Sequence, residues 1–152
     1  MTLRIERALL QDIDALVEFN LAMARETEDK PLDTHRLRNG ITYVLEHPAE
    51  AIYLVARGNR EIAGALMITF EWSDWRCGRF WWIQSVYVQP DWRRQGVYRA
   101  LHAFARNLAL EDPQGCGIRL YVEQDNTIAQ QTYLDLGMVE THYSLFEEEF
   151  SR

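Results

Sequence analysis

The stretch from Phe80 to Leu110 restricts the possible folds of this chain more than any other. Phe80–Val88 is rich in Trp, Ile, Val and Tyr, which predicts a strand, and the strand-like run stops at Pro90. Gly96–Leu110 then places apolar residues at helical spacing, so a helix follows after a short loop. A strand that leads through a loop into a helix indicates an α/β fold with a crossover connection.

The patterns in the rest of the chain predict further strands and helices around this unit. Strands are predicted at Leu3–Arg7, Ala51–Ala56, Ile62–Phe70, Ile118–Val122 and Val139–Phe146. Helices are predicted from Ile13 to Ala24, from Leu37 to Leu45 and from Thr127 to Leu136, where Gly137 ends the last one. The order β-α-α-β-β-β-α-β-α-β predicts an antiparallel meander followed by crossovers that bring parallel strands together. No repeat or linker interrupts it, so residues 1–152 are expected to form a single domain.

Composition excludes several classes of protein. With 152 residues, of which 47% are apolar, the chain suits one globular domain. No leader and no apolar run of about 18 residues is found, so we expect a cytoplasmic protein without a membrane span. Cys77 and Cys116 lie far apart in the sequence, which favours two reduced thiols over a disulfide or a metal pair. The four histidines are scattered, so no metal site is expected.

The charge of the chain is negative overall but locally positive. A net charge of −7 argues against binding to nucleic acid backbones. From Trp92 to Leu110, however, the chain has four arginines and no acidic residue. This contrast favours a discrete anionic ligand over a polyanion.

The loop before the predicted helix has the features of an anion site. Gly96 lets a backbone approach a phosphate closely, and the first amides of the helix lack partners within it. Arg93 and Arg94 add positive charge. The alternative is an ordinary strand-turn-helix with a solvated basic face.

Two motifs in this chain resemble those of the GNAT N-acetyltransferases. The first is Val88-x-Pro90-x-x-Arg93-Arg94-Gln95-Gly96-Val97, which is similar to the acetyl-CoA loop of that family; Tyr98 stands where the family has Gly or Ala. The second is Asn126-x-x-Ala129-x-x-x-Tyr133-x-x-x-Gly137-Met138, with Met138 in place of the usual Phe. The order and separation of the motifs also match the family, so the resemblance covers nearly the whole chain.

The resemblance implies a GNAT-like fold, with a mixed, mainly antiparallel sheet of about six strands, four helices and splayed central parallel strands. It implies that acetyl-CoA is the cosubstrate and that the acetyl group passes directly to a primary amine in a ternary complex, without a metal. The amide of Val86 would polarise the thioester carbonyl. Asn126 would contact the pantetheine or only cap its helix. The residues implied to bind the cofactor are Val86, Tyr87, Val88, Arg93, Arg94, Gln95, Gly96, Val97, Tyr98, Arg99, Asn126 and Tyr133.

The acid and the base of such a reaction have different support. Tyr133 matches the motif position of a general acid for the departing thiolate, although its spacing also fits a core tyrosine. An amine is mostly protonated at neutral pH, so a base has to act directly or through water. Glu71 is the first candidate for that base, Gln84 is a candidate for positioning water or substrate, and Glu123 is a weaker option.

Four of the five tryptophans lie between Trp72 and Trp82. Three roles are open for them. They pack within the sheet, they form an aromatic wall beside the acceptor pocket and bind an alkyl-ammonium by cation–π contact, or they form a homodimer interface. Together with Glu71 and Gln84, Trp72 is a candidate for binding the acceptor, expected to be a small-molecule amine. A catalytically silent CoA-binding sensor or interaction module is the alternative function.

Overall fold

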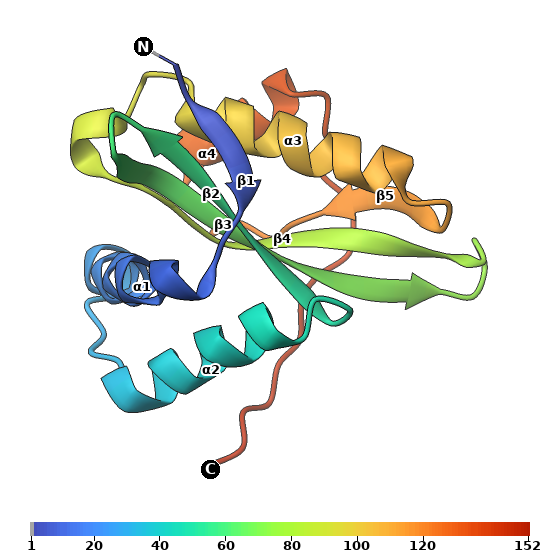
Figure 1. Ribbon diagram of the computed structural model, residues 1–152. Coiled ribbons are helices and arrows are strands. Elements are labelled where there is room, and N and C mark those ends of the chain that lie inside the picture. Colours follow the sequence, from blue (N-terminus) through green and yellow to red (C-terminus); the bar gives the residue numbers. More distant parts are fainter. Residues whose placement is uncertain (1) are drawn as a thin grey trace. The chain divides into compact units, whose positions relative to one another are not determined.

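The computed structural model describes residues 2–152 and contains a curved sheet flanked by helices (Figure 1). The chain divides into two compact units, Met1–Tyr121 and Val122–Arg152. The strands of the first unit are β1 (Arg4–Arg7), β2 (Ala51–Gly58), β3 (Glu61–Ser73), β4 (Gly78–Val88) and β5 (Gly115–Arg119). Its helices are η1 (Leu10–Asp12), α1 (Ile13–Glu28), α2 (Thr34–Glu46), η2 (Pro90–Trp92) and α3 (Val97–Glu111). The second unit contains α4 (Thr127–Asp135).

The strand order in the sheet follows the sequence order. Strands β1 to β4 are antiparallel to their neighbours, whereas β5 runs parallel to β4 because α3 returns the chain between them. This arrangement confirms the predicted α/β class with a meander followed by a crossover.

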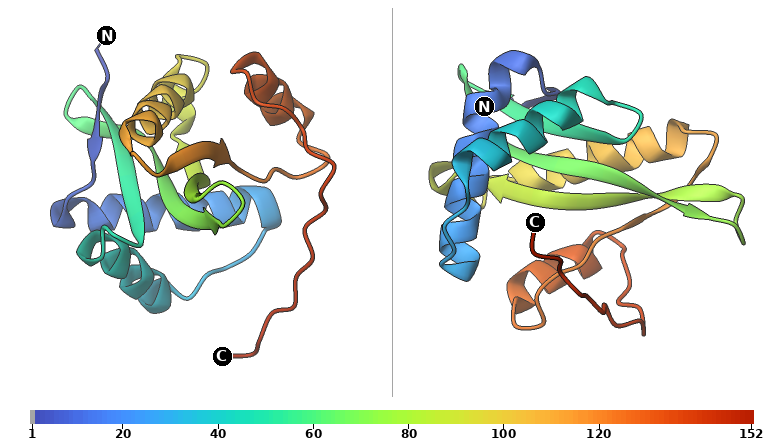
Figure 2. Two further views of the ribbon diagram at one scale, coloured as in Figure 1. Left: turned by 90° about the vertical axis from the view of Figure 1, so that its right-hand side faces the viewer. Right: turned by 90° about the horizontal axis from the view of Figure 1, so that it is seen from below.

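Two hydrophobic cores fill the opposite faces of the sheet, because successive side chains of a strand point to opposite sides. One core lies under α3 and includes the fully buried Leu54, Leu66 and Leu101. The other lies under α1 and α2 and includes Leu16 and Val55. Figure 2 shows α3 on one side of the sheet and α1 with α2 on the other. Each face of the central strands is therefore covered by helix.

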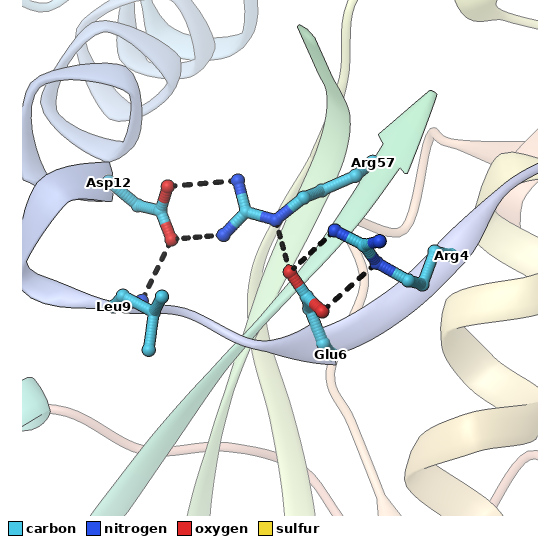
Figure 3. A network of polar contacts seen from close by, with 5 residues as sticks. All are labelled: Arg4, Glu6, Leu9, Asp12 and Arg57. Atoms are coloured by element: carbon cyan, nitrogen blue, oxygen red, sulfur yellow. Dashed lines mark hydrogen bonds and ion pairs between the residues drawn. The ribbon is translucent and has the colours of Figure 1, made fainter. Parts of the chain in front are cut away.

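A polar network closes the corner between β1 and η1 (Figure 3). The Asp12 carboxylate accepts hydrogen bonds from the Arg57 guanidinium at 3.0 and 2.6 Å and from the Leu9 amide at 2.8 Å. The Arg57 guanidinium also contacts Glu6, which pairs with Arg4. Asp12 is only 4% exposed, and these donors offset the cost of burying its negative charge. The same contacts hold the start of α1 against β2.

Two predicted strands differ in the structure. The strand predicted at Ile118–Val122 begins earlier, at Gly115, and ends at Arg119. Close packing requires glycine in the added part of the strand, because a Cβ on Gly117 would lie 2.8 Å from the Phe80 ring.

The strand predicted at Val139–Phe146 is absent, and the segment has no regular secondary structure. Val139, Tyr143 and Leu145 do alternate with polar residues, but within residues 122–152 no strand pairs with the segment, so its backbone forms no ladder. The described residues therefore form five strands instead of about six. No helix within residues 2–152 has the length and apolar character needed to cross a membrane.

Candidate active site

Strand β4 loses its neighbour on one side halfway along its length. Its parallel pairing with β5 runs from Arg79 opposite Gly115 to Trp82 opposite Arg119, where β5 ends. From Ile83 to Val88, β4 therefore pairs only with β3 among the strands of the first unit. This is the splay that the resemblance predicts, and it leaves a row of backbone polar groups facing away from β3.

A β-bulge interrupts β4 within this open half. The register passes from Met67 opposite Gln84 to Ala65 opposite Tyr87, so Ser85 and Val86 together face the single residue Leu66. Ser85 has φ = 51°, in the left-handed region. A bulge turns the strand locally and changes the direction of the backbone groups that follow it.

The direction of these groups follows from one hydrogen bond. The Gln89 amide donates to the Ala63 carbonyl of β3 at 2.9 Å. Because the amides of a regular strand alternate in direction, the Val88 amide points away from β3, toward the open edge. Val86 lies in the bulge, where this alternation is interrupted, so the oxyanion role of its amide stays a prediction.

The loop after β4 leads into a helix whose start has no side-chain cap. Gly96 is the N-cap of α3 with φ = 79°, and Arg94 also has a positive φ of 62°. A Cβ on Gly96 would meet nothing within 4 Å, so the backbone conformation, and not packing, favours glycine there. The first-turn amides from Val97 onward have no acceptor within the helix. They form a ready site for an anion.

Buried anchors hold this loop in place. Trp92 of η2 is 6% exposed and its indole N–H donates to Glu61 at 2.5 Å, while its ring packs against Gly58. Val97 is 2% exposed. The start of α3 is therefore fixed relative to the sheet.

The bulky Tyr98 does not block the start of α3. Its hydroxyl contacts His102 Nδ1 at 3.1 Å, and the two rings lie 5.6 Å apart. His102 is one turn further along the helix, so the Tyr98 ring extends away from the first-turn amides. Burial, together with Arg106 and Arg99, lowers the pKa of His102 and favours its neutral form. The departure from the family motif therefore leaves the backbone of Tyr98 accessible.

The three arginines predicted to bind the cofactor have different surroundings. Arg93 donates to the Val88 carbonyl at 3.0 Å and pairs with Glu26 of α1 at 3.1 Å. Its guanidinium therefore ties the end of β4 to α1. Arg94 and Arg99 are exposed beside the first turn of α3. The binding role of each stays a prediction.

The predicted base, Glu71, lies near the end of β3, beside the half of β4 that pairs with β5. Its carboxylate accepts hydrogen bonds from the Trp82 indole at 3.0 Å and from Arg119 at 2.7 Å. These donors outweigh the effect of burial and lower the pKa of Glu71. Glu71 pairs with Phe80, six positions before Val86, which is about 20 Å along a strand. Glu71 and Val86 are thus too far apart to act on the same reacting atom, so we do not assign the base to Glu71.

The other two residues predicted to bind the acceptor, Gln84 of β4 and Trp72 of β3, lie far apart along the β3–β4 hairpin. Gln84 precedes the bulge by one residue and hydrogen-bonds to Thr69, so it lies beside the predicted reaction centre. Trp72 is 55% exposed and pairs with Arg79 in the distal hairpin. The Phe80 ring of the predicted aromatic wall is covered by the protein's own Arg119 guanidinium, 3.7 Å from the ring centroid.

The second unit contains the other motif. The Asn126 side chain accepts a hydrogen bond from the Ala129 amide at 3.1 Å, which confirms the capping role proposed for it. Tyr133 is half-buried in α4, and burial raises its pKa, which keeps the phenol protonated at neutral pH. Gly137 has φ = 94° just after the helix, as predicted for a residue that ends it.

Within residues 2–152, no three His, Cys, Asp or Glu side chains gather as a metal site requires. The open edge of β4 leads directly to the uncapped start of α3, and such a helix start is able to bind an anion.

The sequence profile of the Acetyltransferase (GNAT) family matches residues 13–138, and the chain belongs to this family. Among solved structures, a possible acetyltransferase from Clostridium difficile 630 is 38% identical over all of both chains, with a TM-score of 0.91. A predicted acetyltransferase from Clostridium acetobutylicum, solved with acetyl-CoA, is 20% identical, covers 97% of this chain and 96% of its own, and has a TM-score of 0.80.

AAC(6')-Iy, solved with the bisubstrate analogue CoA-S-monomethyl-acetylneamine, is 17% identical, with 99% and 100% of the two chains covered and a TM-score of 0.76. The last two likenesses concern the fold. No curated protein sequence matches this chain.

Proposed function

We propose that this protein transfers the acetyl group of acetyl-CoA to a primary amine of a small molecule. The observation that carries the proposal is the open half of β4, Ile83–Val88, which contains a bulge and leads directly to the uncapped start of α3. The pantetheine arm would pair with the amides of this edge, and the pyrophosphate would accept hydrogen bonds from the first turn of the helix. The structure of the Clostridium acetobutylicum relative with acetyl-CoA supports this choice of cosubstrate.

The proposed reaction places the Val86 amide beside the thioester carbonyl. The amine nitrogen attacks the thioester carbon, and the carbonyl oxygen becomes an oxyanion, which the Val86 amide stabilises by a preset hydrogen bond. The C–S bond then breaks, the amine proton passes to a base through water, and the departing thiolate takes a proton. Gln84, one residue before the bulge, is placed to orient that water or the amine.

Tyr133 is the proposed source of the proton for the thiolate. Burial raises the pKa of its phenol, so the group carries its proton at neutral pH. A thiolate whose conjugate acid has a pKa of about 8.5 leaves more easily when a nearby hydroxyl donates to it.

The acceptor is proposed to be a small cationic amine. The net charge of −7 attracts cations in general, and the analogue bound by AAC(6')-Iy joins CoA to a small acetylated amine. Acetyl-CoA also implies a cytoplasmic setting, with which the unpaired Cys77 and Cys116 agree.

Thermal melting with acetyl-CoA, followed by an assay of CoA release, tests this function. Acetyl-CoA is expected to raise the melting temperature because it binds only the folded protein. CoA release is then measured against polyamines, aminoglycosides, amino acids and a lysine peptide. Release with a small amine supports the proposal. A melting shift without release from any amine supports the silent binding module instead, and no shift at millimolar acetyl-CoA contradicts both.

A further inference from the structure

The Arg93 guanidinium is held by groups from two different elements. Arg93 follows η2 and begins the loop that leads to α3. Its Nε donates to the Val88 carbonyl at 3.0 Å, and its Nη2 donates to both carboxylate oxygens of Glu26 in α1, at 3.1 and 3.5 Å. The guanidinium also lies 5.5 Å from the centre of the Tyr87 ring. One side chain therefore connects the loop, the end of β4 and α1.

The Val88 carbonyl belongs to the open edge of β4. The N–H and C=O of one residue in a strand point to the same side, and the Val88 amide points away from β3. This carbonyl has no partner strand, so Arg93 Nε takes the place of the missing donor. An unpaired backbone carbonyl costs free energy, and the Arg93 side chain removes that cost while the Val88 amide stays open.

Tyr87 and Glu26 fix the direction of the guanidinium. Tyr87 is 8% exposed, and its ring lies 5.3 Å from the Phe19 ring of α1. Its hydroxyl donates to Glu26 Oε1 at 3.4 Å, so the tyrosine and the arginine share one carboxylate. Arg93 and Glu26 are 46% and 44% exposed, so their ion pair alone contributes little. The backbone bond and the ring contact add to it.

The neighbouring Arg94 has different surroundings. Its side chain is exposed, and no carboxylate pairs with it among residues 2–152. Its backbone has a φ of 62°, a left-handed conformation that costs free energy for a residue with a Cβ. The contacts of Arg93 hold the residue before it and help to maintain this conformation. Of two adjacent arginines, one is therefore bound by the protein and the other is available to a ligand.

We propose that Arg93 is a positioning residue, which holds residues 93–96 through Val88 and Glu26 so that the first-turn amides of α3 meet the pyrophosphate of acetyl-CoA. The Arg93 guanidinium does not itself contact a phosphate. The resemblance implies a direct contact instead, and the two roles predict different results. The inference rests on the proposed function, because it needs acetyl-CoA to bind at the start of α3.

Glu26→Gln separates the two roles by the sign of its effect. A phosphate-binding Arg93 would be freed by this change, and the loss of a negative charge would favour an anion, so acetyl-CoA would bind more tightly. A positioning Arg93 loses its support, so the affinity is expected to fall by about twofold to fivefold. Isothermal titration calorimetry of the whole protein measures it. Glu28→Gln is the matched control, because it removes the same charge from an exposed position on the same helix.

Arg93→Lys tests the geometry of the side chain. Lysine keeps the charge and can bind a phosphate, but its single ammonium group cannot replace a planar fork that joins Val88 to Glu26. The affinity for acetyl-CoA is expected to fall by about threefold to tenfold, whereas Arg94→Lys should keep it within about twofold. Adding Glu26→Gln to Arg93→Lys should cause little further loss, because both changes break the same contact. A merely structural role would lower the melting temperature without changing affinity.

Four outcomes overturn the inference. These are tighter or unchanged binding in Glu26→Gln, an equal loss in Glu28→Gln, wild-type affinity in Arg93→Lys, and fully additive losses in the double variant. Each of them leaves the binding of acetyl-CoA by the wild type intact. If the wild type does not bind acetyl-CoA, the proposed function fails together with the inference.

Discussion

The two halves of β4 have opposite surroundings. Arg79–Trp82 pairs with β3 on one edge and with β5 on the other, whereas Ile83–Val88 pairs with β3 alone. In the first half the side chains are committed to internal contacts: Arg79 pairs with Asp112 at 2.8 Å, and the Trp81 indole donates to the same carboxylate at 3.0 Å. In the second half the backbone bulges and its amides face an open edge.

This difference separates stability from function along a single strand. Backbone groups without partners inside a protein cost free energy, so a sheet keeps them open only where another group completes the bonds. We infer that the first half stabilises the sheet, and that the second half and the start of α3 await acetyl-CoA. Changes in the open region should therefore affect binding and catalysis, and changes in the paired region should affect unfolding.

The largest expected effect concerns the chemistry that the open half is proposed to serve. Tyr133→Phe removes the hydroxyl proposed to protonate the thiolate and keeps the ring. Its kcat is expected to fall by about 10²–10⁴-fold, with little change in the affinity for acetyl-CoA, because the interaction develops in the transition state. Steady-state kinetics and calorimetry measure the two quantities.

Tyr143→Phe is the matched control, since Tyr143 is 72% exposed in the same unit. It should leave kcat unchanged. A kcat within threefold of wild type in Tyr133→Phe would remove Tyr133 as the acid and leave that step to solvent or another side chain.

A smaller effect is expected from a negative charge at the start of α3. Gly96→Glu places a carboxylate in the open space beside the first-turn amides, where the pyrophosphate is proposed to lie. Charge repulsion near a protein surface is expected to weaken acetyl-CoA binding by about tenfold or more. Calorimetry measures the affinity, and melting without ligand measures the cost of the positive φ at Gly96.

Gly40→Glu provides the comparison for that variant. Gly40 lies exposed on α2, where a Cβ also meets nothing within 4 Å, and it has no positive φ. It should bind acetyl-CoA like the wild type. Equal losses in the two glycine variants would mean that charge acts at long range and that the phosphate site is not at α3.

The smallest effect on function is expected in the paired half. Burial raises the pKa of Asp112, but hydrogen bonds from Arg79, from the Gln114 amide and from Trp81 outweigh it, so the net pKa is lowered. Its stabilisation is therefore present above the unfolded pKa of about 3.9 and is lost as the pH falls through the folded pKa.

Asp112→Asn is accordingly expected to lower the free energy of unfolding by about 1–3 kcal/mol at pH 7. The difference from wild type should shrink as the pH falls below about 4, and acetyl-CoA affinity should stay within about twofold. Urea unfolding at several pH values and calorimetry measure both. A large loss of acetyl-CoA affinity in this variant would contradict the assignment of stability to the paired half of β4 and binding to the open half.

Much of the fold could be predicted from the sequence because local patterns carry it. The apolar runs of β2, β3 and β4 and the helical stripe of α3 are each visible in short windows, and Gly96 marks the start of that helix. The true start of β5 could not be predicted, since the close approach of Gly117 to Phe80 exists only in the assembled sheet. The predicted strand at Val139–Phe146 failed for a related reason, because a strand forms only with a partner.

The candidate site was only partly visible in the sequence. The cofactor loop follows a motif, and so does Tyr133, whereas Glu71 was chosen for its place at a strand end and lies about 20 Å along β4 from Val86. The bulge of β4 was missed altogether, because Ser85, whose φ is 51°, has no local sequence signal for a positive φ.

Backbone amide NMR of the isotope-labelled protein, titrated with acetyl-CoA, tests the central claim most directly. We predict large chemical-shift changes at the amides of Val86 and Val88 and in the first turn of α3, at Val97 and Tyr98. The amide of Trp82, in the paired half of β4, should change little. Shift changes that cluster in the paired half, or a titration that leaves Val86 and Val88 unmoved while acetyl-CoA binds, would contradict the account.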